Sequence, residues 1–120
     1  ISACLVGSEM CIRDRVLTEH IGREVPEEVP LEAAAIWERD VRWLREADVV
    51  VAEVSTPSLG VGYEVALAES WGKPVLALHR AGLRVSAMVT GAPGVAVTAY
   101  RDLEEAEAAL DSFLRDAARV

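Results

Sequence analysis

The sequence has 120 residues, 52% of them hydrophobic, and a formal net charge of −8, so it suits one domain with its own core. No apolar run approaches the ~20 residues that a membrane-spanning helix needs. The acidic balance argues against a nucleic-acid polymer as partner, although a small anion can still bind at one helix terminus. The cysteines, Cys4 and Cys11, lack metal-type spacing, so we expect a reduced, cytoplasmic protein without metal or cofactor.

Residues 1–15 have no clear periodicity, apart from a possible short strand at Cys4 to Gly7. Residues 5–14 resemble the translation of a transposase-type sequencing adapter, with Met-Cys-Ile-Arg-Asp at residues 10–14 as its core. We therefore hypothesise a non-native or disordered segment at 1–15 and a domain at 16–120 whose true beginning was lost in assembly. A poorly structured native N-terminus is the alternative. Genomic DNA that reads continuously through these codons would refute the hypothesis.

From residue 16 onward, short apolar strands alternate with helices. The expected strands are Val16 to His20, Val49 to Val54, Val75 to His79 and Val95 to Tyr100. The expected helices are Leu31 to Ala47, Leu59 to Trp71, the short Val85 to Thr90, and a final helix capped by Asp102. This alternation predicts an α/β fold with a doubly wound parallel sheet in three layers. Residues 1–15 are too few for an opening strand and helix, so we expect both native elements to be missing.

The stretch from Asp48 to Glu64 joins a strand buried on both faces to a helix start that contains glycine. Ser58 can cap the helix, and Gly60 and Gly62 fall in its first turns. Backbone N–H groups and the helix dipole attract an anion at such a junction, and missing side chains let it approach. Glu64 follows one turn later and would face the same crevice. The two glycines do not complete a dinucleotide fingerprint.

Two carboxylates lie in apolar surroundings on the expected helices. Asp40 and Glu64 each have only apolar residues or glycine three and four positions away, where helix neighbours lie. We therefore expect Asp40 to have no cation partner on its helix face. Apolar surroundings raise the pKa of a carboxyl group and suit acid–base chemistry. The alternatives are a half-exposed Asp40 bonded to a nearby loop, and a Glu64 favoured near the helix start by the dipole.

Other candidates carry a weaker signal. His20 and His79 end expected strands, on the edge where doubly wound sheets bind ligands, although a single histidine there is more often structural. Ser86 is most simply the cap of a short helix. Trp37 is most simply a core or dimer-surface residue.

Three motifs occur together in a specific order. They are Asp-Val-Arg-Trp-Leu at 40–44, Ala-Asp-Val-Val-Val-Ala-Glu-Val at 47–54 and Pro-Ser-Leu-Gly-Val-Gly-Tyr-Glu at 57–64. This combination resembles the 2′-deoxynucleoside 5′-phosphate N-hydrolases of the nucleoside 2-deoxyribosyltransferase superfamily. Leu-Thr-Glu-His at 17–20 and Ser-Ala-Met at 86–88 add to the resemblance, which runs from Val16 to about Leu114.

The resemblance implies a Rossmann-like homodimer that hydrolyses the N-glycosidic bond of deoxynucleoside monophosphates. By that resemblance Glu64 is the nucleophile at the anomeric carbon and Asp40 is the second catalytic carboxylate. Ser58 binds the phosphate, Ser86 is lent to the phosphate site of the neighbouring subunit, and His20 lies near the substrate.

Four parts of the family pattern have no counterpart in this sequence. They are the opening strand, a Gly-Ser-Ile-Arg-Gly-Gly-Arg-like phosphate loop, a catalytic tyrosine and the first helix; Tyr63 and Tyr100 lie elsewhere in the pattern. Three alternatives to the hydrolase therefore stay open. They are a deoxyribosyltransferase, a phosphoribohydrolase acting on ribonucleotides, and a nucleotide-binding module without catalysis.

Overall fold

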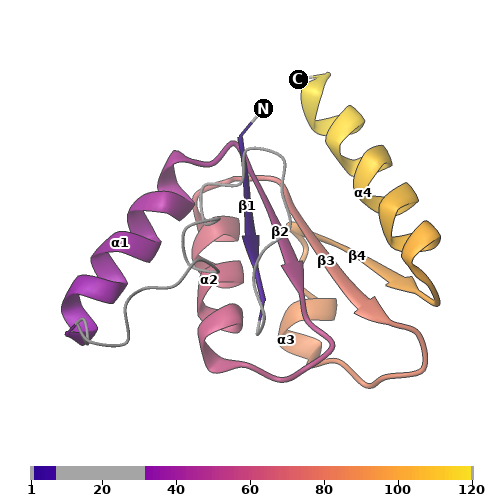
Figure 1. Cartoon of the computed structure of the whole chain (residues 1–120), viewed down its shortest axis with the longest axis horizontal. Coiled ribbons are helices and arrows are strands. Elements are labelled where there is room, and N and C mark those ends of the chain that lie inside the picture. Colours follow the sequence, from indigo (N-terminus) through magenta and orange to yellow (C-terminus); the bar gives the residue numbers. More distant parts are fainter. Residues whose placement is uncertain (1, 8–31, 120) are drawn as a thin grey trace.

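A four-stranded parallel sheet forms the centre of the protein. The computed structural model describes residues 2–7 and 32–119 (Figure 1). The strands lie side by side in chain order: β1 Ala3–Val6, β2 Val49–Glu53, β3 Val75–Arg80 and β4 Val95–Tyr100. The helices are α1 Ala33–Glu46, α2 Leu59–Ser70, α3 Ala87–Thr90 and α4 Leu103–Ala118.

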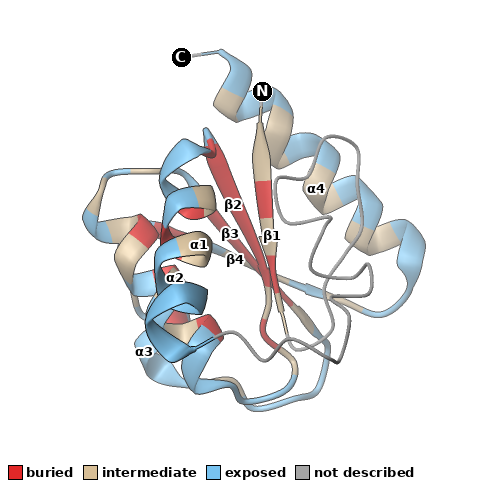
Figure 2. Cartoon of the chain, turned by 60° about the vertical axis from the view of Figure 1, so that its left-hand side comes forward, coloured by how far each residue is buried: buried red, intermediate tan, exposed pale blue. Residues whose placement is uncertain are grey.

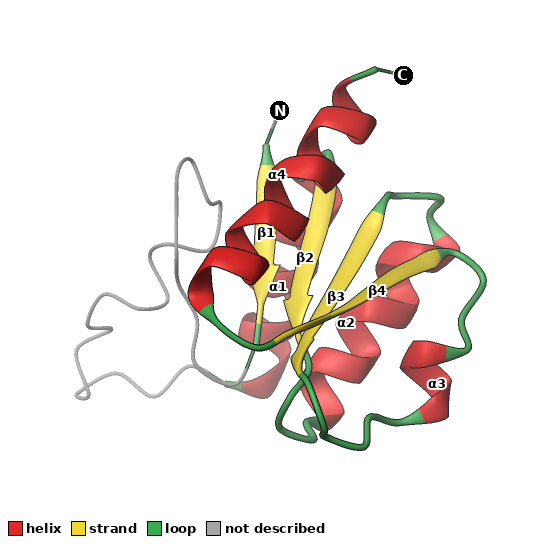
Figure 3. Cartoon of the chain, turned by 90° about the vertical axis from the view of Figure 1, so that its right-hand side faces the viewer, coloured by secondary structure: helices red, strands yellow, loops and turns green. Residues whose placement is uncertain are grey.

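The helices cover both faces of the sheet and divide its core into two clusters. The larger cluster packs α1, α2 and α3 against one face, and its members include Leu44 of α1, Val61 of α2 and Val50 of β2. The smaller packs Leu110 and other residues of α4 against the second face. Figure 3 shows α4 in front of the sheet with α2 and α3 behind it. The predicted three-layer α/β architecture is therefore confirmed, and the order of the described strands runs in one direction without reversal.

β2 is buried along almost its whole length. Its first four residues, Val49 to Ala52, are buried, as Figure 2 shows for the central strands. A strand covered by helices on both faces must be apolar on both faces, which explains the unbroken valine run. The last residue, Glu53, is only half-buried because it lies where the strand leaves the sheet interior.

Residues 3–6, which belong to the segment expected to be non-native or disordered, form the edge strand β1. Residues 3–6 pair in parallel with β2, in a register that places Ala3 opposite Val49 and Val6 opposite Ala52. The carbonyl of Ser2 accepts hydrogen bonds from the N–H groups of Asp48 and Val49. The possible strand at Cys4 to Gly7 is thus confirmed, shifted by one residue to Ala3–Val6. The non-native origin of residues 1–15 stays a prediction.

The remaining bounds agree closely with the predicted ones. Among the elements from α1 to α4, the largest difference at a boundary is two residues, at the starts of α1 and α3. Asp102 caps α4, since its Oδ1 accepts from the N–H of Glu105 at 2.9 Å. The predicted strand at 16–20 lies outside the described residues, as does the region in which the first helix was expected to be missing. No helix in the described ranges combines the length and hydropathy that crossing a bilayer requires.

Leu44 should be essential to the position of α1. Its side chain is 0% exposed and lies one helical turn after Asp40. We expect Leu44→Ala to lower the free energy of unfolding by about 2–5 kcal/mol, because the cavity adds to the lost burial. Urea unfolding measures this change, with Arg42→Ala on the exposed side of α1 as the control. A loss below about 1 kcal/mol would contradict the packing role of Leu44.

Candidate active site

The β2–α2 junction forms the helix start that the sequence predicts. Ser58 has extended backbone dihedrals, φ −150° and ψ 124°, and its Oγ accepts from the N–H of Val61 at 3.3 Å. The carbonyl of Ser58 accepts the first backbone bond of the helix, from Gly62 at 3.1 Å. The N–H groups of Leu59 and Gly60 come before that bond, at the positive end of the helix dipole. They are the groups that hold an anion at a helix start.

Glu64 lies one turn into α2, and the pKa of its carboxyl group is raised. Its side chain is half-buried, and two nearby residues of the same helix, Val61 and Val65, are both buried. Burial, and then the negative charge of Asp40, raise the pKa of Glu64 from 4.5 to about 7. The predicted effect of apolar surroundings on this carboxyl group is confirmed. Glu64 can therefore exist in both protonation states near neutral pH, as an acid–base or nucleophilic carboxylate requires.

Asp40 reaches the same region from α1, and its environment differs from the prediction. Its Oδ1 accepts from Nε of Arg39 at 3.0 Å, and both side chains are half-buried. The expectation that Asp40 has no cation partner is therefore wrong. The guanidinium of Arg39 also lies 5.0 Å from the centre of the Trp43 ring, which holds it along the helix surface. Arg39 thus orients one oxygen of Asp40, while the charge of Asp40 still acts on Glu64.

Trp37 and Tyr63 join the two helices beside these carboxylates. Nε1–H of Trp37 donates to the hydroxyl of Tyr63 at 3.3 Å, and the residues are 51% and 53% exposed. Trp37 lies one turn before Asp40, and Tyr63 directly precedes Glu64. Sequence reasoning assigned neither aromatic residue to the site. The sequence signal that could have assigned them is their position, since Trp37 comes three residues before Asp40 and Tyr63 directly precedes Glu64.

Gly60 faces both the capping serine and the catalytic candidate. A Cβ built on Gly60 would lie 3.9 Å from Oγ of Ser58 and 4.0 Å from Oε1 of Glu64. These two groups therefore border one space, which the missing side chain leaves open. A Cβ on Gly62 would meet nothing within 4 Å, so the structure gives no steric reason for a glycine at this position. The predicted role of Gly62 in binding stays a prediction.

We expect Gly60→Ala to separate stability from function. The methyl group fits at ordinary contact distances, so removing a helical glycine should stabilise α2 by about 0.5–1 kcal/mol. The same methyl group would occupy the space between Ser58 and Glu64 and lower kcat/KM by about tenfold or more. Thermal unfolding and steady-state kinetics measure the two effects. Ala66→Gly, on the exposed side of α2, is the control that should lose stability and keep activity.

Among the described residues, Ser86 and His79 have partners of their own, and no hydrogen bond or ion pair joins either of them to Glu64. Ser86 caps α3, and its Oγ accepts from the N–H of Met88 at 3.2 Å. Nδ1 of His79 lies 2.9 Å from the carbonyl of Arg80, which agrees with a structural role. His20 lies outside the described residues.

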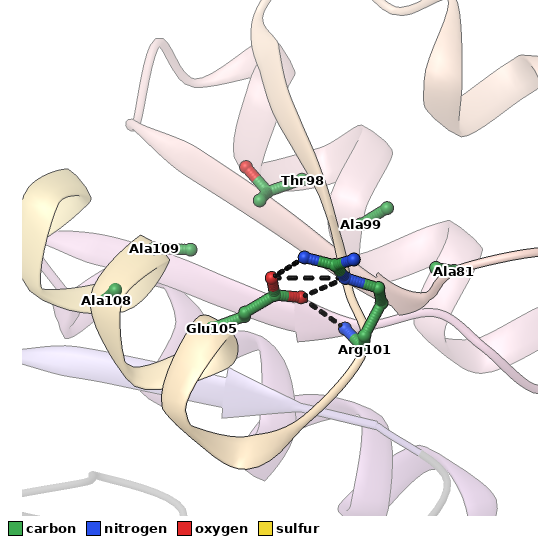
Figure 4. A pocket seen from close by; sticks show the side chains of 7 residues that line it. All are labelled: Ala81, Thr98, Ala99, Arg101, Glu105, Ala108 and Ala109. Carbon is green, nitrogen blue, oxygen red and sulfur yellow. Dashed lines mark hydrogen bonds and ion pairs between the residues drawn. The ribbon is translucent and has the colours of Figure 1, made fainter.

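A separate shallow hollow of about 600 Å³ lies on the opposite face of the sheet, beside the start of α4 (Figure 4). Small side chains of β4 and α4 line it together with Arg101 and Glu105. Nη2 of Arg101 lies 2.7 Å from Oε2 of Glu105, and this partner lowers the pKa of Glu105 to about 2. The charge of Arg101 is thus already compensated, so the hollow offers a phosphate less attraction than the start of α2 does.

A helix start of the kind that can bind an anion, beside two neighbouring carboxylates, suits an enzyme that cleaves a bond in a small phosphorylated sugar compound. The chain belongs to the nucleoside 2-deoxyribosyltransferase family, because the model of that family matches residues 9–107. The resemblance inferred from the three sequence motifs is thereby confirmed at the level of the family.

Three curated relatives show how far the similarity extends. The 5-hydroxymethyl-dUMP N-hydrolase of Tetraodon nigroviridis is 47% identical over 106 residues, which cover 82% of this chain and 75% of the relative. The mouse protein of the same name is 54% identical over 84 residues, covering 65% of this chain and 49% of the relative. A Syntrophotalea carbinolica protein, provisionally named a 2′-deoxynucleoside 5′-phosphate N-hydrolase, is 53% identical over 74 residues, covering 60% and 52%. The aligned part of the chain thus spans about half the length of the last two relatives.

Proposed function

We propose that this chain hydrolyses the N-glycosidic bond of 2′-deoxynucleoside 5′-monophosphates to a free base and 2-deoxyribose 5-phosphate. The observation that carries the proposal is the Glu64 carboxyl, whose pKa of about 7 reflects burial and the adjacent Asp40. The single space that Glu64 and Ser58 border supports a substrate with a sugar at one end and a phosphate at the other. The names of the three relatives, all N-hydrolases of deoxynucleotides, support the same reaction.

The proposed reaction begins at the anomeric carbon. The Glu64 carboxylate attacks C1′ while the C1′–N bond breaks, and the electron pair leaves with the base. Asp40 relays a proton from water to the leaving base, and the water molecule that later hydrolyses the ester returns one proton to solvent. Water then hydrolyses the deoxyribosyl–Glu64 ester and restores the carboxylate. The start of α2, with Ser58 and the exposed Gly60, holds the 5′-phosphate. A deoxy sugar lacks the electron-withdrawing 2′-OH, so positive charge builds on it more readily.

Incubation with deoxyguanosine monophosphate tests the proposal. Guanine released from this substrate, and not from guanosine monophosphate, is the expected result. Release from both substrates equally would favour the phosphoribohydrolase alternative. Base exchange after addition of a free acceptor base would favour the transferase. If the folded protein binds the nucleotide and releases no base, the result would favour a nucleotide-binding module without catalysis.

We also propose that the active form is a cytoplasmic homodimer in which Ser86 serves the partner's phosphate site. Two large apolar side chains support a dimer interface at the start of α2 and on α3. Leu59 is 96% exposed and Met88 is 85% exposed, and a partner subunit would cover them. Sedimentation at micromolar concentration tests the dimer. Mixing Ser86→Ala with Glu64→Gln tests the shared site, because recovery of activity requires sites built from both chains.

A further inference from the structure

Glu53 ends β2 with its side chain on the face that α4 covers. Val51, two residues earlier and therefore on the same face, belongs to the cluster that packs against α4. Tyr100, the last residue of β4, packs against that cluster too. A half-buried carboxylate at the edge of an apolar cluster needs hydrogen-bond partners.

Both oxygens of Glu53 are used, and they join two distant parts of the chain. The hydroxyl of Tyr100 donates to Oε2 of Glu53, and the N–H of Ser55 donates to Oε1 at 2.6 Å. The bond to the carboxylate raises the pKa of the Tyr100 hydroxyl, as expected for a donor to a negative group. Glu53 therefore connects the end of β4 to Ser55, the second residue of the β2–α2 loop.

A third bond fixes the same loop residue from β3. Oγ of Ser55 accepts from the N–H of Arg80 at 2.9 Å. Ser55 is thus held by the last residue of β2 and by the last residue of β3. The next three residues, Thr56 to Ser58, are exposed, and Pro57 restricts the backbone between them. The direction in which the chain enters α2 depends on how firmly Ser55 is held, because so short a segment transmits the orientation of one end to the other.

We propose that Tyr100 and Glu53 are positioning residues that hold the β2–α2 loop so that Ser58 and the start of α2 bind the substrate phosphate. This inference rests on the proposed function, but neither residue contacts the reacting atoms. Their contribution is to the geometry of the phosphate site and not to the chemistry at Glu64. A defect in them should therefore weaken binding of the phosphate and leave the chemical step largely intact.

Tyr100→Phe is the main test because it removes one hydroxyl and keeps the ring in its cluster. KM for deoxyguanosine monophosphate and the inhibition constant of inorganic phosphate should both rise about tenfold, the effect of one lost hydrogen bond, with kcat within about twofold. The amide hydrogen of Ser55 should also exchange faster. Glu53→Gln, which can still accept from Ser55 and donate to the Tyr100 oxygen, should retain most phosphate affinity. Glu53→Leu should lose it.

Glu69→Gln is the matched control. Oε2 of Glu69 accepts from the N–H of Gly94 at 2.6 Å. This bond has the same kind and length as the bond from Ser55 to Glu53, but it lies at the amino end of β4, away from Tyr100. This variant should keep KM, kcat and the exchange rate of Ser55. A Tyr100→Phe protein with unchanged KM and unchanged Ser55 exchange would overturn the inference, as would a fall in kcat at constant KM. If wild-type protein released no base, the proposed hydrolase would fail, while phosphate binding by NMR and Ser55 exchange would still decide the role of Tyr100.

Discussion

Glu64→Gln should abolish base release from deoxyguanosine monophosphate while the protein stays folded. The amide cannot form the ester with C1′, so kcat should fall by about 10³-fold or more. Gln has nearly the same shape, so the packing beside Val61 and Val65 should persist. Single-turnover release of guanine measures the loss, with circular dichroism as the test of folding. Glu46→Gln, an exposed carboxylate on α1, is the control that should keep full activity. Undiminished turnover in Glu64→Gln would refute the assignment.

The same variant should become more stable than the wild type as pH rises. The pKa of Glu64 is about 7 in the folded protein against 4.5 ordinarily, so the folded state binds this proton more tightly than the unfolded chain. Wild-type stability therefore falls as pH rises from about 4.5 to about 7, and the penalty is complete above that range. Glu64→Gln lacks this penalty. Because Glu64 is only partly buried, we expect a difference on the order of 1 kcal/mol above pH 7.

Urea unfolding at several pH values measures this difference. The two proteins should have converging free energies of unfolding below pH 4.5 and separate above pH 7, with Glu64→Gln the more stable. Glu46→Gln should follow the wild type throughout. A stability difference that is constant with pH would mean that the ionisation of Glu64 is not its source.

Asp40→Asn should lower activity strongly and also shift its pH dependence. Loss of a carboxylate that assists proton transfer to the leaving base should cost about 10²-fold or more in kcat/KM. Asp40 also raises the pKa of Glu64, so its neutral replacement should lower that pKa. The rising limb of kcat/KM against pH, which reports ionisation of the nucleophile, should then move to lower pH.

The residual activity of Asp40→Asn between pH 5 and pH 9 tests this prediction. Asn keeps an oxygen that can accept from Nε of Arg39, so the variant should fold as the wild type does. Glu38→Gln, on the exposed part of α1, is the control. An unchanged rising limb in a folded Asp40→Asn protein would show that the two carboxylates do not act on one another.

The candidate site divides into a part that local patterns predict and a part that they miss. The role of Ser58 as a cap follows from neighbours within four residues, where helix geometry leaves few choices. The apolar neighbours of Glu64 on its own helix predict the direction of its pKa shift, but the contribution of Asp40 comes from another helix. The pairing of Arg39 with Asp40 was missed because adjacent helical residues point in different directions. A long arginine side chain overcomes that separation by folding along the helix surface beside Trp43.

The sequence by itself determined the order of elements from α1 to α4, the buried nature of β2 and the position of the helix start that would bind an anion. Each of these depends on periodicity or capping over a few residues, and such signals survive without knowledge of the fold. The three family motifs add the identity of the two carboxylates as candidates, since they specify order and spacing.

Only the tertiary structure decided what lies beside what across the sheet. The sequence suggests β1 only as a possible strand, and its parallel pairing with β2 and its register are set by the assembled sheet. Tyr100 and Glu53 are 47 residues apart, and they meet because parallel strands bring their carboxyl ends to one edge. The proximity of Asp40 to Glu64 likewise depends on how α1 and α2 pack over the sheet. Long-range contacts of this kind arise from the layered packing as a whole, so no local stretch of sequence encodes them.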